Sequence, residues 1–312
     1  MVISLYQPLS FCQIGQRTNQ EDCRLPDADS PSEVPFFFAV CDGVGGCDDG
    51  EVASRSVCEG FKDALEGTDW SEPFTVDDFQ QALTETYERL DDVAKGAGNK
   101  DMATTLAFIC FHGDGCLVAH IGDSRIYQIR PETGIVYRSS DHSQVNNLIH
   151  AGVISPDQSE SSPDRSVISR YMEPSSNEAP RCMATVLQTR DIRPDDYFFL
   201  CTDGVLECVD DETLCRIICL QASDEEKCGE IAALCQRSYD NNTAYLLHVA
   251  AVDTTNDDME QEDVEIHDDT PYTEHQTIVG HRHLSHTVDV EPDEPDTPMM
   301  GGILNFIKKI FH

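Results

Sequence analysis

In the stretch FFFAVCDGVGG, residues 36–46, six apolar residues lead directly into Asp42, and a glycine-rich turn follows. An uninterrupted apolar run of this length that ends at a turn signal is typical of a buried strand. A carboxylate at the end of such a strand is held by a rigid scaffold and can still face a cleft. The stretch therefore predicts a buried strand that delivers Asp42 to a functional site.

Three further aspartates stand in comparable places. Asp123 follows the apolar run 118–122, Asp203 follows the run 197–202, and Asp240 precedes the last strand-like segment. One Asp-Gly dipeptide is more often an ordinary turn than a ligand, but four strand-end aspartates are harder to explain in this way. Converging carboxylates would repel one another unless a cation lies between them. Oxygen ligands without His or Cys favour Mg²⁺ or Mn²⁺ over Zn²⁺.

The periodicity of apolar residues predicts the other elements. Strands are expected at 36–41, 105–111, 117–122, 126–130, 197–201 and 244–252, with turns at 112–115 and 130–134. Helices are expected at about 51–66, 76–95, 143–151, 210–221 and 224–238. Because helices follow runs of strands and do not alternate with them, the pattern favours an α+β fold with antiparallel sheets over a doubly wound fold.

The charge balance restricts the partners of the chain. Its 312 residues include 58 acidic and 21 basic side chains, which gives a formal net charge of −37. A field of this sign repels nucleic acid and anionic membranes, so no nucleic-acid partner is expected. The same field suits the collection of divalent cations, although solubility alone would account for most of the charge.

Cysteine usage and the N-terminus favour a cytoplasmic protein with free thiols. The 14 cysteines include no CxxC pair and no zinc-finger spacing, and many lie in apolar runs, where a thiol packs like a small hydrophobic group. The segment Met1–Phe11 lacks the basic start and apolar core of a signal peptide. No stretch of about 18 apolar residues is present to span a membrane.

The sequence divides into a globular part, 1–252, and a tail. From Asp253 to Met300 there are 15 acidic residues and one basic residue, with four prolines, so we expect 253–300 to be a disordered acidic linker. Residues 301–312 place apolar residues at helical spacing and predict a short amphipathic helix. Such a helix is marginal alone and could dock on a partner, on a membrane surface or on its own domain.

An N-terminal element adds Arg17, Glu21 and Asp22 to the set of polar residues. An arginine beside carboxylates could form a salt bridge. Its planar guanidinium could also hold a phosphate group.

These residues form an ordered series of short motifs. The series is Arg17-x-x-x-Glu21-Asp22, Asp42-Gly43-x-Gly45-Gly46, Thr104-Thr105, Gly122-Asp123-Ser124-Arg125, Asp141-His142-Ser143, Asp203-Gly204 and Asp240-Asn241-x-Thr243. In order and approximate spacing it resembles the metal-dependent (PPM, type 2C) protein serine/threonine phosphatases over about residues 10–252. The stretches 42–55 and 141–154 resemble the bacterial branch of that family.

The resemblance implies a four-layer αββα sandwich of two antiparallel sheets flanked by helices. It implies two Mn²⁺ or Mg²⁺ ions, with Asp42 bridging both, the Gly43 carbonyl on one, and Asp203 and Asp240 completing the other. Asp123 would help to form a third, weaker metal site with Asp203. Glu21 and Asp22 would act mainly through metal-bound waters, and Arg17 would hold the substrate phosphate. The segment from about 145 to 170 would form a flap beside the cleft.

The resemblance also implies the reaction, which is hydrolysis of phosphoserine and phosphothreonine by a metal-bridged hydroxide, with Arg17 neutralising charge and no covalent phosphoenzyme. Such an enzyme would act on phosphorylated proteins and oppose a bacterial Ser/Thr kinase. Val44 stands where some members have a His that protonates the leaving group, so a water must supply that proton. Gln20 and Ser166 replace asparagines common in the family, and His142 is expected to make structural hydrogen bonds.

Two other functions remain open at this point. The first is a catalytically weak regulatory or scaffold protein of the same fold that acts through its tail, although all four aspartates and Arg17 are retained. The second is a generic acidic cation-binding protein, which would bind many ions weakly and hydrolyse nothing.

Overall fold

The computed structural model describes residues 1–44, 49–98, 101–155, 158, 162, 167–175, 181–253 and 266–267. The strands are β1 (Val2–Leu5), β2 (Leu9–Gln13), β3 (Cys23–Leu25), β4 (Phe37–Cys41), β5 (Leu106–His112), β6 (Gly115–Ile121), β7 (Arg125–Arg130), β8 (Gly134–Arg138), β9 (Thr185–Thr189), β10 (Tyr197–Cys201), β11 (Asn242–Asp253) and β12 (Ile266–His267). The helices are α1 (Gly50–Ala64), α2 (Val76–Gly96), α3 (Gln144–His150), α4 (Asp203–Leu206), α5 (Asp211–Ile218) and α6 (Asp224–Cys235).

The described strands form two antiparallel sheets. One has the order β1-β11-β10-β7-β8, and β2 also pairs with β11. The other has the order β12-β9-β6-β5-β4-β3. β11 is long enough to pair with both β1 and β2, because Val2 faces Asp253 at one end and Gln13 faces Asn242 at the other. This pairing brings the N-terminal segment beside the last long strand.

Side-chain alternation along the central strands builds the layers. In β5, Phe108 packs in the cluster beneath α1 and α2, whereas its neighbour Ile109 packs in a second cluster with residues of the other sheet. In β10, Leu200 joins that shared cluster, and its neighbour Phe199 packs in a third cluster with α5 and α6. Because successive side chains of a strand point to opposite faces, these strands contribute to two apolar layers at once.

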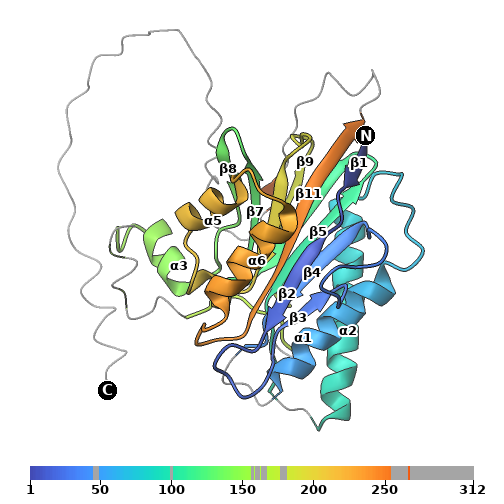
Figure 1. Ribbon diagram of the computed structural model, residues 1–312. Helices are drawn as coiled ribbons and strands as arrows, with labels where there is room; N and C mark the ends of the chain where they lie inside the picture. The colour runs from blue at the N-terminus through green and yellow to red at the C-terminus, as the bar shows by residue number, and fades with distance from the viewer. Residues whose placement is uncertain are drawn as a thin grey trace, which may run out of the picture. The chain divides into compact units, whose positions relative to one another are not determined.

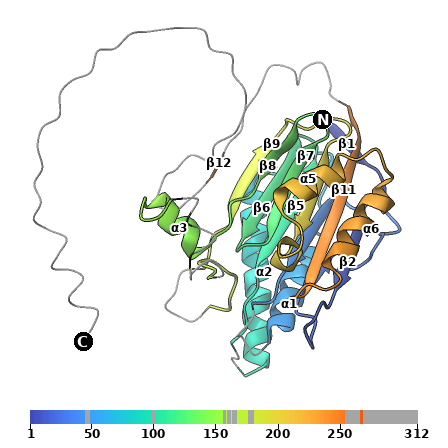
Figure 2. The same ribbon diagram turned by 60° about the vertical axis from the view of Figure 1, so that its left-hand side comes forward.

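Helices cover the outer faces of both sheets (Figure 1). Figure 2 shows α5 and α6 in front of the sheet that contains β11, with α1 and α2 on the far side. Thr75 begins α2 with a reciprocal hydrogen bond to Asp78, and Ser223 begins α6 in the same way with Glu226. These caps satisfy amide groups that have no partner inside the helix. The predicted four-layer αββα sandwich is confirmed.

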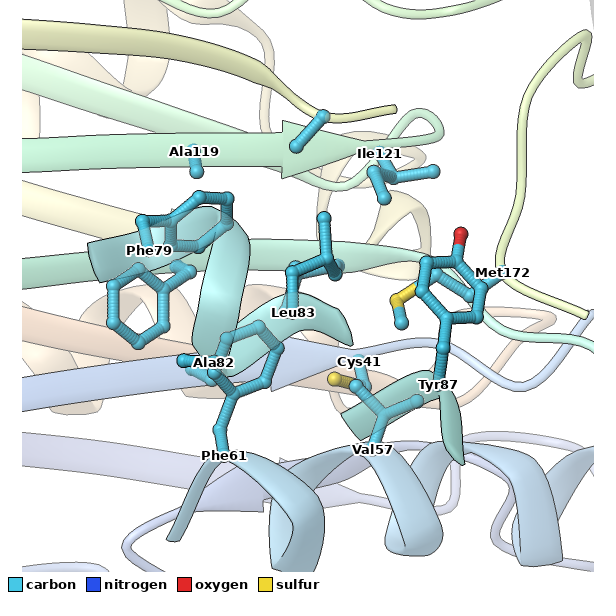
Figure 3. Packing of buried hydrophobic residues seen from close by; sticks show 14 of the residues in the cluster. Cys41, Val57, Phe61, Phe79, Ala82, Leu83, Tyr87, Ala119, Ile121 and Met172 are labelled. Atoms are coloured by element: carbon cyan, nitrogen blue, oxygen red, sulfur yellow. The ribbon is translucent and has the colours of Figure 1, made fainter. Parts of the chain in front are cut away.

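The layer beneath α1 and α2 contains stacked aromatic rings among aliphatic side chains (Figure 3). Phe61 of α1 lies 5.0 Å from Phe108 and 5.8 Å from Phe79, measured between ring centroids. All three side chains are fully buried. Truncating such a residue to alanine typically costs about 3–5 kcal/mol. This layer therefore anchors β4, and with it Asp42, against the helices.

All six predicted strands and all five predicted helices are present, with ends shifted by a few residues. The prediction omitted β1, β2, β3, β8, β9, β12 and the short helix α4. Most of these strands are short, and β9, with the sequence TVLQT, has no run of apolar residues. Their position depends on pairing with a long neighbouring strand, which local periodicity does not reveal.

Most of the predicted linker 253–300 and all of the predicted helix 301–312 lie outside the described residues. Two linker residues, Ile266–His267, do form a strand, β12, which pairs with Val186 and Leu187 of β9. In the described part of the chain, no helix has the length and apolar character needed to cross a membrane. Every described cysteine is a free thiol, as predicted.

Candidate metal centre

The structure brings the predicted aspartates together at strand ends from both sheets. Asp42 follows β4, Asp123 follows β6, Asp203 follows β10, and Asp240 lies just before β11. The charges of Asp22, Asp203 and Asp123 act on Asp42, and the charge of Asp240 acts on Asp203. Five carboxyl groups from distant parts of the chain therefore lie close enough for their charges to act on one another.

Burial and mutual repulsion disfavour the charged form of four of these groups, Asp22, Asp42, Asp123 and Asp203. Burial, reinforced by the neighbouring carboxylates, raises the pKa of Asp42 well above its usual range. Burial also raises the pKa of Asp22 and of Asp123 to about 7 each, and the charge of Asp203 adds to both shifts. The pKa of Asp203 is raised too, again mainly by burial. A bound cation would reverse the repulsive contribution to each shift.

Three buried carboxylate oxygens of the site have no hydrogen-bond partner among the described residues. They are Oδ1 of Asp22, Oδ1 of Asp123 and Oδ1 of Asp203. Buried polar atoms are nearly always paired, so unpaired oxygens in one cluster call for a partner from outside the chain. Hard, anionic oxygen donors without a thiol or imidazole are the ligands that Mg²⁺ and Mn²⁺ prefer. The residues present thus fit such an ion.

Two contacts currently occupy oxygens that an ion would need. The carboxyl groups of Asp42 and Asp203 interact directly, and Arg17 forms an ion pair with Asp240. Consistent with this, no three His, Cys, Asp or Glu side chains of the described ranges already stand at metal-ligating positions. An ion between these carboxylates would favour the charged form of both Asp42 and Asp203 and would compete with Arg17 for Asp240.

Two adjacent threonines hold the backbone of Asp42. Its carbonyl accepts a hydrogen bond from the amide of Thr105 at 2.9 Å and from the hydroxyl of Thr104 at 2.8 Å. Its own amide donates to the Thr105 hydroxyl at 3.0 Å. Both threonines are fully buried. The Thr104-Thr105 motif therefore fixes the position of the Asp42 backbone just after β4.

Gly43 lies where no side chain would fit. A Cβ atom there would come within 2.6 Å of the backbone of Gly50, at the start of α1, and within 2.8 Å of the carbonyl oxygen of Glu21. Its amide donates to that carbonyl at 3.1 Å. The predicted Gly43 carbonyl ligand thus belongs to a tightly packed turn, while Gly45 and Gly46 of the same motif lie beyond the residues that can be described.

Asp22 is buried in the site, and Asn241 links the N-terminal motif to the segment that leads into β11. The Thr202 hydroxyl donates to Oδ2 of Asp22 at 2.9 Å. The side chain of Asn241 accepts from the amide of Glu21 at 2.8 Å and donates to the carbonyl of Ile14 at 2.9 Å. Asn241 adjoins Asp240, so this cross-link sets the position of the N-terminal motif against the end of β11. Neither Thr202 nor the linking role of Asn241 was predicted from the sequence.

A hydrogen-bonded turn positions Asp123. The preceding residue, Gly122, has a φ of +103° and would place a Cβ 2.6 Å from Thr105. Its amide donates to Nδ1 of His142 at 3.1 Å, and the other ring nitrogen of His142 bonds the Thr185 hydroxyl at 2.9 Å. Burial lowers the pKa of His142 well below its usual value, so the ring is neutral. These contacts agree with the structural role predicted for His142.

Arg125 and Asp141 brace the same turn from the other side. The guanidinium donates two hydrogen bonds to the carboxylate, each 2.7 Å long. This paired geometry is the strongest form of a charged hydrogen bond. Both residues stand in the motif series, but their pairing was not predicted from the sequence.

The predicted flap, 145–170, is described only in part. It includes α3, and Ile168 forms an isolated bridge with Ser143 just before that helix. Ser166 lies outside the described residues.

Gln20 accepts a hydrogen bond from the amide of Asp22 at 3.1 Å, so it supports the site directly. The amide of Val44 donates to the carbonyl of Ala103 at 2.9 Å.

Comparison with known proteins agrees with this fold. The protein phosphatase 2C family matches residues 13–234, so the chain belongs to that family. The chain is 27% identical over 238 residues to a putative protein phosphatase 2C-type of Streptococcus pyogenes, covering 75% of this chain and 94% of that protein. It is 31% identical over 207 residues to the serine/threonine protein phosphatase PstP of Mycobacterium tuberculosis, covering 64% of this chain and 37% of that protein.

A solved structure shows the same fold. The catalytic domain of PstP, in complex with two manganese ions, superposes with a TM-score of 0.62 at 25% sequence identity, covering 79% of this chain and 99% of that chain. The relatives named here are bacterial, as the motifs predicted.

Proposed function

We propose that this chain is a metal-dependent protein phosphatase that hydrolyses phosphate esters of serine and threonine in proteins. The observation that carries the proposal is the set of converging aspartates with unpaired buried oxygens, beside an exposed arginine. Membership of the protein phosphatase 2C family and the serine/threonine phosphatase among the relatives support it. Such an activity would oppose a Ser/Thr kinase.

Asp42, the Gly43 carbonyl, Asp203 and Asp240 would hold two Mn²⁺ or Mg²⁺ ions, and Asp123 would serve a third site. The two manganese ions in the PstP structure support this stoichiometry. When bound, such ions polarise phosphate oxygens and make water a better nucleophile at neutral pH. Glu21 and Asp22 would act mainly through metal-bound waters.

The side chains of the protein supply positioning and charge. Arg17 presents an exposed guanidinium at the edge of the site and would hold two oxygens of the substrate phosphate. Thr202 holds the carboxylate of Asp22, and Asn241 holds the backbone of Glu21, through hydrogen bonds that are already formed without substrate. Val44 offers no proton to the leaving serine or threonine oxygen, so that proton must come from water.

The proposal is tested by incubating the full chain with phosphoserine and phosphothreonine peptides in Mn²⁺ and measuring phosphate release. We expect turnover that EDTA abolishes and added Mn²⁺ restores. Phosphotyrosine peptides and a nucleic-acid phosphodiester serve as comparison substrates. Turnover that persists in EDTA, or none on any phosphoserine or phosphothreonine substrate, would contradict the proposal.

A further inference from the structure

Hydrogen bonds join two turns beside Arg17, one at residues 14–17 and one at residues 237–240. The amide of Gln16 donates to the carbonyl of Ser238 at 3.0 Å, and its side chain donates to the carbonyl of Arg237 at 2.8 Å. Gly15 has a φ of +58° and lies so close that a Cβ would fall 2.1 Å from the carbonyl oxygen of Asp240. We call residues 14–17 and 237–240 the rim. Because its two halves are bonded to each other, the rim is a preformed surface.

The second half of the rim turns two side chains outward. Ser238 points inward, is 2% exposed, and donates to Glu207 at 2.8 Å. Its neighbours Arg237 and Tyr239 face solvent, and the side chain of Tyr239 is 76% exposed. Ile14, on the first half, is 45% exposed. Tyr239 is thus the most exposed of the large apolar side chains of the described residues, and it directly precedes Asp240.

Arg237 is unusual in so acidic a chain. Most arginines of the described ranges pair with a carboxylate, as Arg125 does with Asp141 and Arg130 with Asp196. Arg237 is exposed and has no such partner among the described residues. In a molecule of net charge −37, an uncompensated guanidinium on the same rim as Arg17 favours anions locally.

An exposed tyrosine alone needs no explanation. Here, however, an aromatic ring, an aliphatic side chain and a free guanidinium share one rigid rim with the arginine assigned to the phosphate. Aromatic and arginine side chains carry much of the binding energy at protein interfaces. A peptide whose phosphorylated residue reaches Arg17 must run its neighbouring residues over the surface around that point.

We propose that the rim is a substrate-specificity surface that reads the residues flanking the phosphorylated side chain. Tyr239 and Ile14 would contact an apolar flanking side chain, and Arg237 would pair with a flanking Asp or Glu. This proposal rests on the proposed phosphatase function and adds a class of substrate to it, namely phosphorylated segments that combine apolar and acidic flanking residues.

The test compares the full chain in Mn²⁺ on matched phosphoserine peptides. A parent peptide has alanine on both sides of the phosphoserine, and variants carry Phe or Asp at single flanking positions. We expect at least one Phe position and one Asp position to raise kcat/KM about fivefold over the parent, since a good interface contact contributes about 1 kcal/mol. Tyr239→Ala should remove the preference for Phe, and Arg237→Ala should remove the preference for Asp.

One conservative and two distant variants complete the test. Tyr239→Phe should keep the preference for Phe, because the ring remains. Tyr6→Ala and Lys62→Ala alter exposed side chains of the same kinds outside the rim, and they should leave both ratios as in the wild type.

The outcomes separate the two proposals. Equal turnover of all phosphopeptides by the wild-type chain, or ratios that survive Tyr239→Ala and Arg237→Ala, would overturn the specificity rim and leave the phosphatase function standing. Ratios lost equally in Tyr6→Ala would also overturn the rim. No turnover of any phosphoserine peptide by the wild type would instead remove the phosphatase function itself.

Discussion

Nη2 of Arg17 lies 2.5 Å from Oδ2 of Asp240, in an ion pair that joins residues 223 positions apart. The arginine side chain is 47% exposed and the aspartate side chain 26% exposed, so the pair sits at the mouth of the site. Arg17 therefore touches a proposed metal ligand on one side and solvent on the other. Its guanidinium can serve the substrate phosphate only if it shares or leaves Asp240.

We expect Arg17→Ala to lower kcat/KM for a phosphoserine peptide by about 10–100-fold, because a hydrogen bond to a charged group contributes about 1.5–3 kcal/mol. Arg17→Lys should be intermediate, since it keeps the charge but loses the two-pronged geometry. The Mn²⁺ concentration needed for half-maximal activity should not rise in either variant, because Asp240 loses a competitor. A large rise would mean that Arg17 organises the metal ligands and does not hold substrate.

Removing one carboxylate from the centre should separate stability from activity. Asp42→Asn and Asp203→Asn each relieve repulsion among buried carboxylates whose pKa values are raised. In EDTA, both variants should therefore melt at or above the wild-type temperature. Turnover in Mn²⁺ should fall more than about 100-fold, because even groups one contact away from a metal change activity about 10–100-fold. Thermal melts with and without Mn²⁺, together with phosphate release, check this.

The control for these variants is Asp69→Asn, at an exposed aspartate of the α1–α2 connection. It should leave both the melting temperature and turnover near wild type. Turnover that survives either Asp42→Asn or Asp203→Asn would remove the metal centre from the proposed function.

Asp123 stands apart from the other ligands in its surroundings. It follows β6, in a turn braced by His142 and by the Arg125–Asp141 pair, whereas Asp203 and Asp240 flank neighbouring strands of the other sheet. We expect Asp123→Asn to slow turnover but to keep most of the thermal stabilisation by Mn²⁺, since two other ions would still bind. Calorimetric titration should show one weak metal site fewer. Loss of all Mn²⁺ binding would place Asp123 in the main centre.

The sequence predicted the parts of the site that depend on local pattern. An apolar run followed by an aspartate is visible in any one segment, so β4, β6 and β10 and their terminal carboxylates could be located. The contact between Asp42 and Asp203 and the pairing of Arg17 with Asp240 could not, because they depend on the relative positions of two sheets. Thr202 and Asn241 were unassigned for the same reason, since their partners lie 180 and 220 residues away.

The strands that the prediction missed have a related cause. β1 and β2 are stabilised by pairing along β11, and β3 has three residues that pair with β4. Their own sequences mix polar and apolar residues over spans too short to show a period. The missed β2 is the strand that carries the chain to Arg17, so the placement of the rim emerged only from the structure.

A substitution at Gly204 would test how closely α4 is packed against the start of β11. A Cβ on this residue would lie 1.9 Å from the carbonyl oxygen of Asn241, which is backbone and cannot move aside like a side chain. We expect Gly204→Ala to push α4 from the start of β11 and so to separate Asp203 from Asp240. Turnover should fall at least tenfold and the free energy of unfolding by about 1–3 kcal/mol, as for overpacking elsewhere.

The matched control is Gly229→Ala. Gly229 lies inside α6, with nothing within 4 Å of the position of its Cβ. Alanine there should raise the free energy of unfolding by up to about 1 kcal/mol, because glycine is a poor helix former, and turnover should not change. Urea unfolding and phosphate release on both variants separate a packing clash from a general effect of alanine. Wild-type turnover in Gly204→Ala would show that α4 and the start of β11 can move apart without loss of activity.

His112, at the end of β5, should make stability depend on pH. The ring is 5% exposed, and its Nδ1 accepts a hydrogen bond from the amide of Asp114 at 3.2 Å. Burial, with the positive charges of Arg190 and the N-terminus, lowers the pKa of His112 to about 4. In the unfolded chain the pKa returns to about 6.5. Between these values the unfolded chain binds the extra proton, so the stabilising contribution is complete above about pH 6.5 and is lost as the pH falls towards 4.

We therefore expect the free energy of unfolding of the wild type to fall by about 2–3 kcal/mol more than that of His112→Asn between pH 7 and pH 4.5. Asparagine keeps an acceptor near the position of Nδ1 but does not titrate in this range. Urea unfolding in EDTA at a series of pH values measures the difference, and the active-site carboxylates contribute equally to both proteins and cancel. Parallel pH profiles for the two proteins would show that His112 is protonated in the folded state as readily as in the unfolded chain.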